Sequence, residues 1–214
     1  MRTIVSFPLN DISDYKASLL AWSQRFKEIV WLDSNEHTDE YGAFEVLLAV
    51  DANSSLVVRR TTGAFDKLKT YRNECGDWLF GFLSYDLKNG IEDLFSSNFD
   101  GLLFPNLFFF QPKKIIKIHD GHIQFMYLDA YADEIQVDYS AIFGEQVLAE
   151  RKSAKSSPIR IKMRIFKDDY FKRARNMLAH IHRGDIYEAN FCQEFYAENA
   201  TINPIEVYKH LNKI

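Results

Sequence analysis

Residues 114–128 read Lys-Ile-Ile-Lys-Ile-His-Asp-Gly-His-Ile-Gln-Phe-Met-Tyr-Leu. Apolar residues dominate on both sides of the central Asp120-Gly121 pair, and runs of this kind are typical of β-strands. The Asp-Gly pair favours a tight type I′ turn, because both turn positions need a positive φ angle. The stretch therefore predicts an antiparallel hairpin with strands at Lys114–Ile118 and His122–Leu128.

Further strand-like runs lie on both sides of this hairpin. They are Glu28–Asp33, Ala43–Val50, Ser55–Arg60, Trp78–Tyr85, Phe108–Gln111, Ile159–Ile165 and Ile186–Ala197. Asp51-Ala52-Asn53 has the residue types of a turn, so we expect it to separate the second of these strands from the third. Gly81 interrupts an apolar run, which indicates either a bulge or a close approach of another backbone segment.

Four segments have the spacing of helices. They are Asp11–Phe26, Asp133–Glu150, Lys167–His182 and Pro204–Leu211. The third is the clearest, because its apolar residues follow one stripe and Gly184 comes directly after it. Strands and helices do not alternate as a parallel doubly wound sheet requires. The sequence therefore predicts an α+β fold with a large antiparallel sheet or two packed sheets.

The composition excludes several classes of protein. Of the 214 residues, 47% are hydrophobic and 15% aromatic, with only 9 Gly and 5 Pro. A disordered or collagen-like chain would have few apolar residues or many Gly and Pro. The net charge of −4 lacks the basic footprint of a nucleic-acid-binding domain, so no nucleic-acid partner is expected. Without a signal peptide or a long apolar stretch, no membrane association is expected, and we predict a cytoplasmic protein.

The segment Arg151–Pro158 contains no large apolar residue and is the best candidate for a linker. It divides the chain into an N-terminal α+β part, residues 1–150, and a second part, residues 159–214. His180 and His182 lie two apart on the clearest helix and point to different faces, so no shared metal site is expected there. Cys75 and Cys192 match no metal or redox spacing and are expected to be reduced.

Two stretches combine residue types suited to a binding site. Ser34 leaves a predicted strand, and Tyr41-Gly42-Ala43-Phe44 follows seven residues later. A hydroxyl and an aromatic ring at opposite ends of such a loop can frame an amphipathic ligand, but the same residues can form a turn and an apolar plug. In the other stretch, Gln193 interrupts an apolar strand face. A buried amide needs hydrogen bonds, so Gln193 either bonds a neighbouring backbone or faces a polar ligand.

Three segments together resemble the chorismate-utilising enzymes. Residues 184–195, Gly-Asp-Ile-Tyr-Glu-Ala-Asn-Phe-Cys-Gln-Glu-Phe, are similar to that family's Gly-Asp-Ile-Tyr-Gln-Val-Asn-Leu-x-Gln-Arg-Phe signature. Residues 81–87 resemble its Gly-x-x-x-Tyr-Asp/Glu-Leu stretch, and Leu32-Asp33-Ser34 with Tyr41 resembles its N-terminal loop. Asn190 and Gln193 make component I of aminodeoxychorismate (para-aminobenzoate) synthases the most similar subfamily. Glu188-Ala189 and Glu194 depart from the signature, which weakens the subfamily assignment more than the family assignment.

The resemblance implies an α+β fold in which two antiparallel sheets pack as a β-sandwich with helices outside. It implies a Mg²⁺-dependent reaction in which ammonia from a glutamine amidotransferase, component II, replaces the 4-hydroxyl of chorismate. The product, 4-amino-4-deoxychorismate, leads to para-aminobenzoate and folate. The family's Pro-Ile-Lys-Gly-Thr motif with its nucleophilic Lys and its magnesium-binding Glu-rich segments have no match here. We therefore expect no catalytic or metal-ligating residue in this chain, and expect it to be an N-terminal portion of a longer enzyme.

The resemblance also implies a tryptophan pocket in residues 1–150. Ser34 would bond the polar end of the ligand, Tyr41 would pack near its ring, and the pocket would continue along Gly42, Ala43 and Phe44. Tyr187 and Asn190, at the start of the truncated chorismate-binding part, are either pocket residues or structural residues. They face opposite sides of a regular strand, so both can reach one pocket only through a bulge.

Two other functions remain open from the sequence. One is component I of an anthranilate synthase, which belongs to the same family. The other is a non-catalytic module that binds tryptophan and is complete as it stands.

Overall fold

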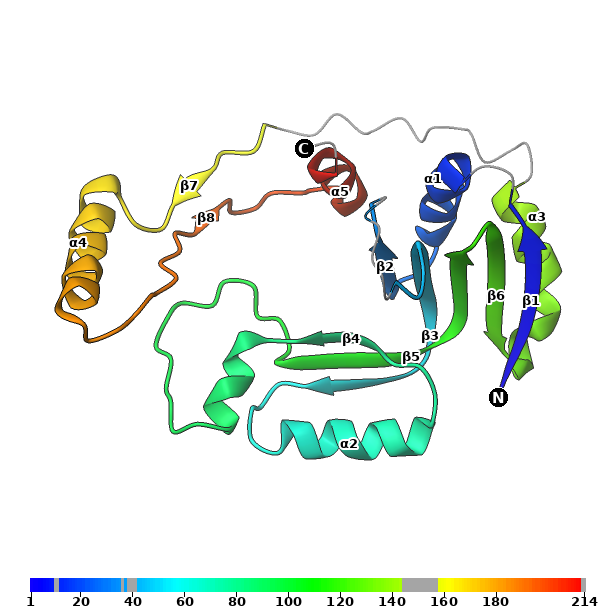
Figure 1. Cartoon of the computed structure of the whole chain (residues 1–214), viewed down its shortest axis with the longest axis horizontal. Coiled ribbons are helices and arrows are strands. Elements are labelled where there is room, and N and C mark those ends of the chain that lie inside the picture. Colours follow the sequence, from blue (N-terminus) through cyan, green and yellow to red (C-terminus); the bar gives the residue numbers. More distant parts are fainter. Residues whose placement is uncertain (10–11, 36, 38–41, 144–157, 213–214) are drawn as a thin grey trace. The chain divides into compact units, whose positions relative to one another are not determined.

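A computed structural model describes residues 1–9, 12–35, 37, 42–143 and 158–212. The chain divides into two compact units, Met1–Ala149 and Glu150–Ile214. Both units combine helices with antiparallel strands (Figure 1), so the predicted α+β class with an antiparallel sheet and flanking helices is confirmed. The packing of a second sheet on the first stays a prediction.

Six of the described strands form one antiparallel sheet in the first unit. The central path runs β1–β6–β5–β3–β2, and β4 pairs with β5 beside this path. The strands are β1 (Arg2–Pro8), β2 (Ile29–Asp33), β3 (Val46–Val58), β4 (Phe80–Leu83), β5 (Leu107–His119) and β6 (His122–Leu128). The helices are α1 (Ile12–Ser23), α2 (Ala64–Cys75) and α3 (Ile135–Phe143), with short 3₁₀ helices η1 (Tyr85–Gly90) and η2 (Asp129–Glu134).

The hairpin between β5 and β6 is confirmed. His119 pairs with His122, so the turn contains only Asp120 and Gly121, and their φ angles are 49° and 67°. Both positive values are those of a type I′ turn, which the Asp-Gly pair favours. The local sequence was sufficient to predict this hairpin, because the residue types of the turn and its two-residue length favour the same turn type.

The predicted turn at residues 51–53 is wrong, because β3 continues through it as a single strand. Asp51 takes a positive φ of 62°, and the register shifts between Ala52 and Ser54, which is a β-bulge. Both halves of β3 pair with β5, which likewise joins two runs that we had expected as separate strands. Turn-type residues here bend a long strand instead of ending it.

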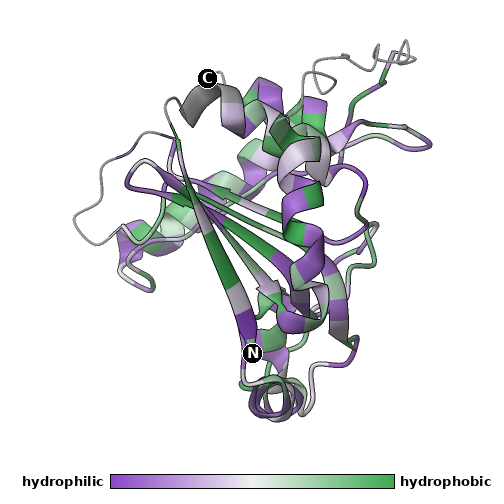
Figure 2. Cartoon of the chain, turned by 90° about the vertical axis from the view of Figure 1, so that its right-hand side faces the viewer, coloured by the Kyte–Doolittle hydropathy of each residue, from purple (hydrophilic) through white to green (hydrophobic). Residues whose placement is uncertain are grey.

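Two apolar clusters pack against opposite faces of the sheet. In the first part of β3, Val46–Val50, even-numbered residues such as Leu48 join α1 and α3 in the larger cluster, which contains Leu19 and Ile142. Odd-numbered residues of this part, such as Leu47, lie in a second cluster with Phe110. This part of β3 is therefore apolar on both faces, and Figure 2 shows apolar residues dominating the sheet strands while polar and apolar residues alternate along the helices.

A polar network is buried where β3 and β5 bend. Arg2 donates to both carboxylate oxygens of Asp77, at 2.9 and 2.8 Å, and to the backbone carbonyls of Pro112 and Met126. The side chain of Gln111 donates to Asp77 at 2.8 Å. Burial alone would raise the pKa of Asp77, but the hydrogen bonds from Arg2 and Gln111 outweigh it and hold this pKa below its ordinary value.

The lowered pKa of Asp77 predicts that the stability of the fold at this bend decreases at acidic pH. A carboxyl group with a lower pKa in the folded state stabilises the fold above its unfolded pKa of about 4, and this contribution is lost as the pH falls through the folded pKa. We expect Asp77→Asn to flatten the decline in unfolding free energy between about pH 5 and pH 2. Urea unfolding across this range measures it. Asp66→Asn, on the exposed face of α2, is the control, and an equal flattening in both variants would contradict the prediction.

The second unit contains β7 (Lys162–Met163), α4 (Lys167–Arg183), β8 (Phe195–Tyr196) and α5 (Pro204–Leu211). The predictions of α4 and α5 are confirmed, and Gly184 ends α4 with a φ of 85°. The predicted long strand at Ile186–Ala197 is wrong, since only its last part pairs with β7. Backbone without a neighbouring strand cannot form a ladder, whatever its side-chain pattern.

Several other predictions can be placed. The strand at Ile159–Ile165 is shortened to β7, and the helix predicted at Asp133–Glu150 is α3 in its described part. Residues 144–150 of that helix and residues 151–157 of the predicted linker lie outside the described residues. β1 and α2 were not predicted from the sequence.

Candidate functional site

The first candidate segment begins where β2 ends. Asp33 pairs with Val46, and the ladder continues by one hydrogen bond from the Ser34 amide to the Glu45 carbonyl, at 2.9 Å. The Ser34 carbonyl then accepts from the His37 amide at 2.9 Å. Both backbone groups of Ser34, its amide and its carbonyl, are therefore fixed by hydrogen bonds, and Ser34 is the first residue of a turn.

The other side of this segment is the start of β3. The Glu45 amide donates to the Ile118 carbonyl at 2.9 Å, and the Glu45 side chain accepts from the Asp120 amide at 3.2 Å. Phe44 is half-buried and packs against the cluster that contains Leu47 and Phe110. The strand start beside Ser34 is thus fixed by the β5–β6 hairpin and by apolar packing.

The structure brings some of the predicted pocket residues together. Ser34 lies across the ladder from Glu45, next to Phe44 in the chain, while Gly42 and Ala43 are exposed. Tyr41 lies outside the described residues. The assignment of these residues to a tryptophan pocket stays a prediction.

The side chain of Asp33 supports this turn, a role that the sequence analysis did not assign to it. One of its oxygens accepts from Lys16 Nζ at 2.8 Å and from the Asn35 amide at 2.9 Å. An Asp that bonds the amide two residues later forms an Asx turn, so the Asp-Ser-Asn order was a usable signal. Nothing local in the sequence points to Lys16, which comes from α1.

In the second unit, the signature segment starts at the C-terminal end of α4. Asp185 accepts hydrogen bonds from His180, at 2.7 Å, and from Arg183. These bonds, that from Arg183 foremost, hold the pKa of the Asp185 carboxyl below its ordinary value. The glycine at 184 permits the left-handed conformation that turns the chain out of the helix.

The far end of the signature is fixed by the residues that directly follow β7. Gln193 Nε2 donates to the Ile165 carbonyl at 3.0 Å, so of the two roles left open for this amide the structure shows the structural one. Glu194 forms two hydrogen bonds with the Arg164 guanidinium, at 2.8 and 3.1 Å. These bonds lower the pKa of Glu194. The departure from the family's Arg at position 194 is therefore matched by a cation, Arg164, directly after β7.

Between these two anchors the signature residues are exposed, except for Phe191, which is half-buried and stacks on Tyr170. Tyr187 is 93% exposed and lines a concavity of about 430 Å³ together with Ile181 and Asp185. Asn190 is also exposed but does not line this concavity. The structure does not bring Tyr187 and Asn190 to one described pocket, so their role as pocket residues stays a prediction.

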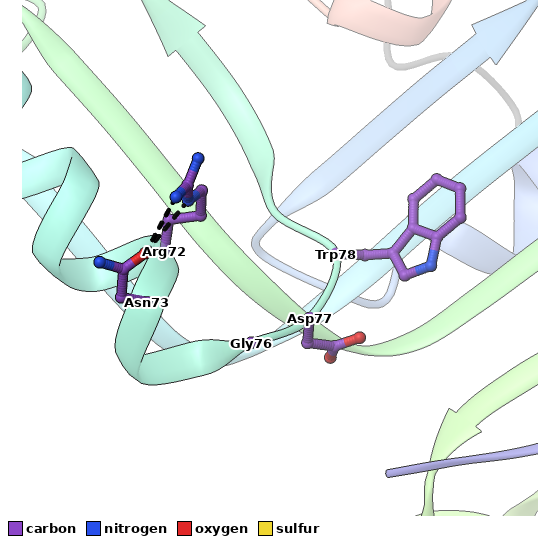
Figure 3. Close-up of a pocket in the computed structure, with 5 residues that line it drawn as sticks. All are labelled: Arg72, Asn73, Gly76, Asp77 and Trp78. Carbon is purple, nitrogen blue, oxygen red and sulfur yellow. Dashed lines mark hydrogen bonds between the residues drawn. The ribbon is translucent and has the colours of Figure 1, made fainter.

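Sequence reasoning did not indicate a wider concavity in the first unit. It measures about 850 Å³ and lies at the C-terminal end of α2. Figure 3 shows its lining, with Arg72 and Asn73 on the helix and Trp78 on the segment that leads into β4. The Asp77 carboxylate in this lining is already bound by Arg2. The concavity therefore combines the Trp78 ring, which is 46% exposed, with the polar side chains of Arg72 and Asn73.

Among the described side chains, no group of three or more His, Cys, Asp or Glu lies together in a way that could hold a metal ion. The described residues therefore do not fit a magnesium site built from such a group. Within the same residues, no helix is long and apolar enough to cross a membrane.

Residues 27–214 match the family of chorismate binding enzymes, which is most of the chain. The chain therefore belongs to this family, and the predicted family is confirmed. It is 31% identical over 144 residues to an anthranilate synthase component I-like protein from Synechocystis sp. strain PCC 6803. The aligned region covers 65% of this chain but only 28% of that relative.

Proposed function

We propose that the chain is the N-terminal part of component I of an aminodeoxychorismate synthase. The whole protein would replace the 4-hydroxyl of chorismate by ammonia, release water and keep the enolpyruvyl group, giving 4-amino-4-deoxychorismate for para-aminobenzoate and folate. The observation that carries the proposal is the family match, which includes the whole signature at residues 184–195. Ammonia would come from a glutamine amidotransferase partner, component II.

The role proposed for this chain is binding. The turn at Ser34 and the strand start at Gly42, Ala43 and Phe44, with Tyr41, would hold tryptophan, with the hydroxyl at its polar end. The fixed backbone of Ser34 and the half-buried ring of Phe44 support this assignment. Mg²⁺, which would neutralise the substrate carboxylate, is proposed to bind residues outside this chain.

A second function is favoured by one observation. The Synechocystis relative is described as anthranilate synthase component I-like. Anthranilate synthase acts on the same substrate but also releases pyruvate, so the two reactions differ in a product that is easily measured. A tryptophan-binding module without catalysis is the remaining candidate.

The test uses the protein as it is translated from its gene, beside residues 1–214 alone. Both are incubated with chorismate, Mg²⁺ and excess ammonium, and products are identified by mass. We expect 4-amino-4-deoxychorismate without pyruvate from the gene product, and no turnover from residues 1–214, since they lack the family's Lys motif. Anthranilate with pyruvate would contradict the proposal in favour of the second function. Tryptophan binding without either product would favour the module.

A further inference from the structure

The Asp33 carboxylate connects a helix to the turn that carries Ser34. A single oxygen, Oδ1, accepts both from Lys16 Nζ, at 2.8 Å, and from the Asn35 amide, at 2.9 Å. The Asp33 side chain is 8% exposed and that of Lys16 is 23% exposed. The pair is therefore shielded from solvent, where charge-assisted hydrogen bonds are stronger than on an open surface.

The turn needs this support. Asn35 has a φ of 50°, a left-handed conformation that is unfavourable for residues other than Gly unless local hydrogen bonds favour it. The Asx turn from Asp33 to the Asn35 amide supplies such a bond. Ser34 lies between these two residues, so the direction of its side chain depends on the turn.

Lys16 connects this turn to the packed core of the first unit. It lies one helical turn before Leu19, which is fully buried in the core between α1 and the sheet, as is Trp22. A cation on a firmly packed helix can fix the orientation of Asp33 better than a solvent-exposed Lys could.

We propose that Lys16 is a positioning residue for tryptophan binding. Through Asp33 it holds the turn in the conformation that presents the Ser34 hydroxyl to the ligand. This inference rests on the proposed function, because it assumes that the ligand binds beside Ser34. Losing one charge-assisted hydrogen bond of this kind is expected to weaken binding on the order of tenfold.

The experiment measures L-tryptophan binding by calorimetry and amide exchange at Ser34 and Asn35 in residues 1–214. Lys16→Met keeps the apolar stem and removes the charge, and Lys16→Arg restores a donor. Lys27→Met is the matched control, because Lys27 follows the C-terminal end of the same helix and pairs with Glu28 through a side chain that is 92% exposed. Melting temperatures are recorded for every variant, to separate loss of binding from loss of folding.

We expect Lys16→Met to raise the dissociation constant about tenfold and to speed exchange at Asn35, with recovery in Lys16→Arg and no change in Lys27→Met. Unchanged affinity in Lys16→Met would overturn the proposal, as would a lower melting temperature without a change in affinity. If the unmodified chain binds no tryptophan, the proposed pocket itself is wrong and the positioning role falls with it. The exchange at Asn35 then still shows whether the ion pair holds the turn.

Discussion

Replacing Lys114 by Met is expected to lower the free energy of unfolding by about 3–5 kcal/mol, because it leaves a buried carboxylate without its cation. Lys114 Nζ lies 2.5 Å from Asp138 and 2.5 Å from Glu134, and its side chain is only 5% exposed. The Tyr127 hydroxyl also donates to Asp138, at 3.0 Å. Burial raises the pKa of Tyr127 well above its ordinary value, and the charge of Asp138 raises it further, so the hydroxyl keeps its proton.

The neighbouring residue provides the control for this prediction. Lys113 forms an ion pair with Asp51 at 3.1 Å, but both side chains are partly exposed. Exposed ion pairs contribute about 0–1 kcal/mol, so Lys113→Met should be nearly neutral. Urea unfolding at pH 7 measures both variants. Similar losses for the two would show that the burial of Lys114 does not matter.

A double variant separates the loss of the ion pair from the loss of packing. Lys114→Met combined with Asp138→Leu removes both charges and retains apolar volume between α3 and the sheet. Because replacing a buried pair by apolar residues is often close to neutral, we expect the double variant to be more stable than Lys114→Met alone. If it is less stable, the main role of Asp138 is its hydrogen bond with Tyr127.

The elements that could be predicted from sequence are those whose signal is local. The Asp120-Gly121 turn and the helix Lys167–Arg183, which ends at a glycine, each carry their stop signals within a few residues. β1 lacks such a signal. α2 is followed directly by Gly76 in the left-handed conformation, which is the same kind of stop signal as in α4. Only Ala64 of this helix is fully buried, however, so its apolar stripe is too short to stand out from a polar background.

Long-range pairing accounts for the remaining differences. Asp51 can end a strand or bend it, and only the continuous partner strand β5 decides which. In the same way, Gln193 could have faced a ligand or a backbone carbonyl, and its partner Ile165 lies 28 residues away. The relation of Ser34 to the strand start at Phe44 was foreseeable, but its support by Lys16 depends on how α1 packs. Sequence patterns thus predict which residues come together in a site. They predict less readily which residues support that site.

Replacing Gly81 by Ala is expected to lower the free energy of unfolding by about 3 kcal/mol, at the upper end of what overpacking costs. A Cβ atom at this position would lie 1.9 Å from the Phe108 carbonyl oxygen and 2.7 Å from Phe109 Cα. Both neighbours are backbone atoms of β5, so no side chain can rotate away to make room. The close backbone approach that the isolated glycine indicated is therefore confirmed, and relief requires β4 to move away from β5.

Amide exchange distinguishes this local separation from general unfolding. We expect Gly81→Ala to speed exchange at Phe82 and Leu83 in β4 more than at the β5–β6 hairpin, because only the β4–β5 ladder must separate. Gly63→Asn is the control, since Gly63 has a φ of 68°, which Asn tolerates, and no atom lies within 4 Å of its Cβ position. If Gly81→Ala is no more destabilising than Gly63→Asn, then β4 is not held against β5 as closely as the structure places it.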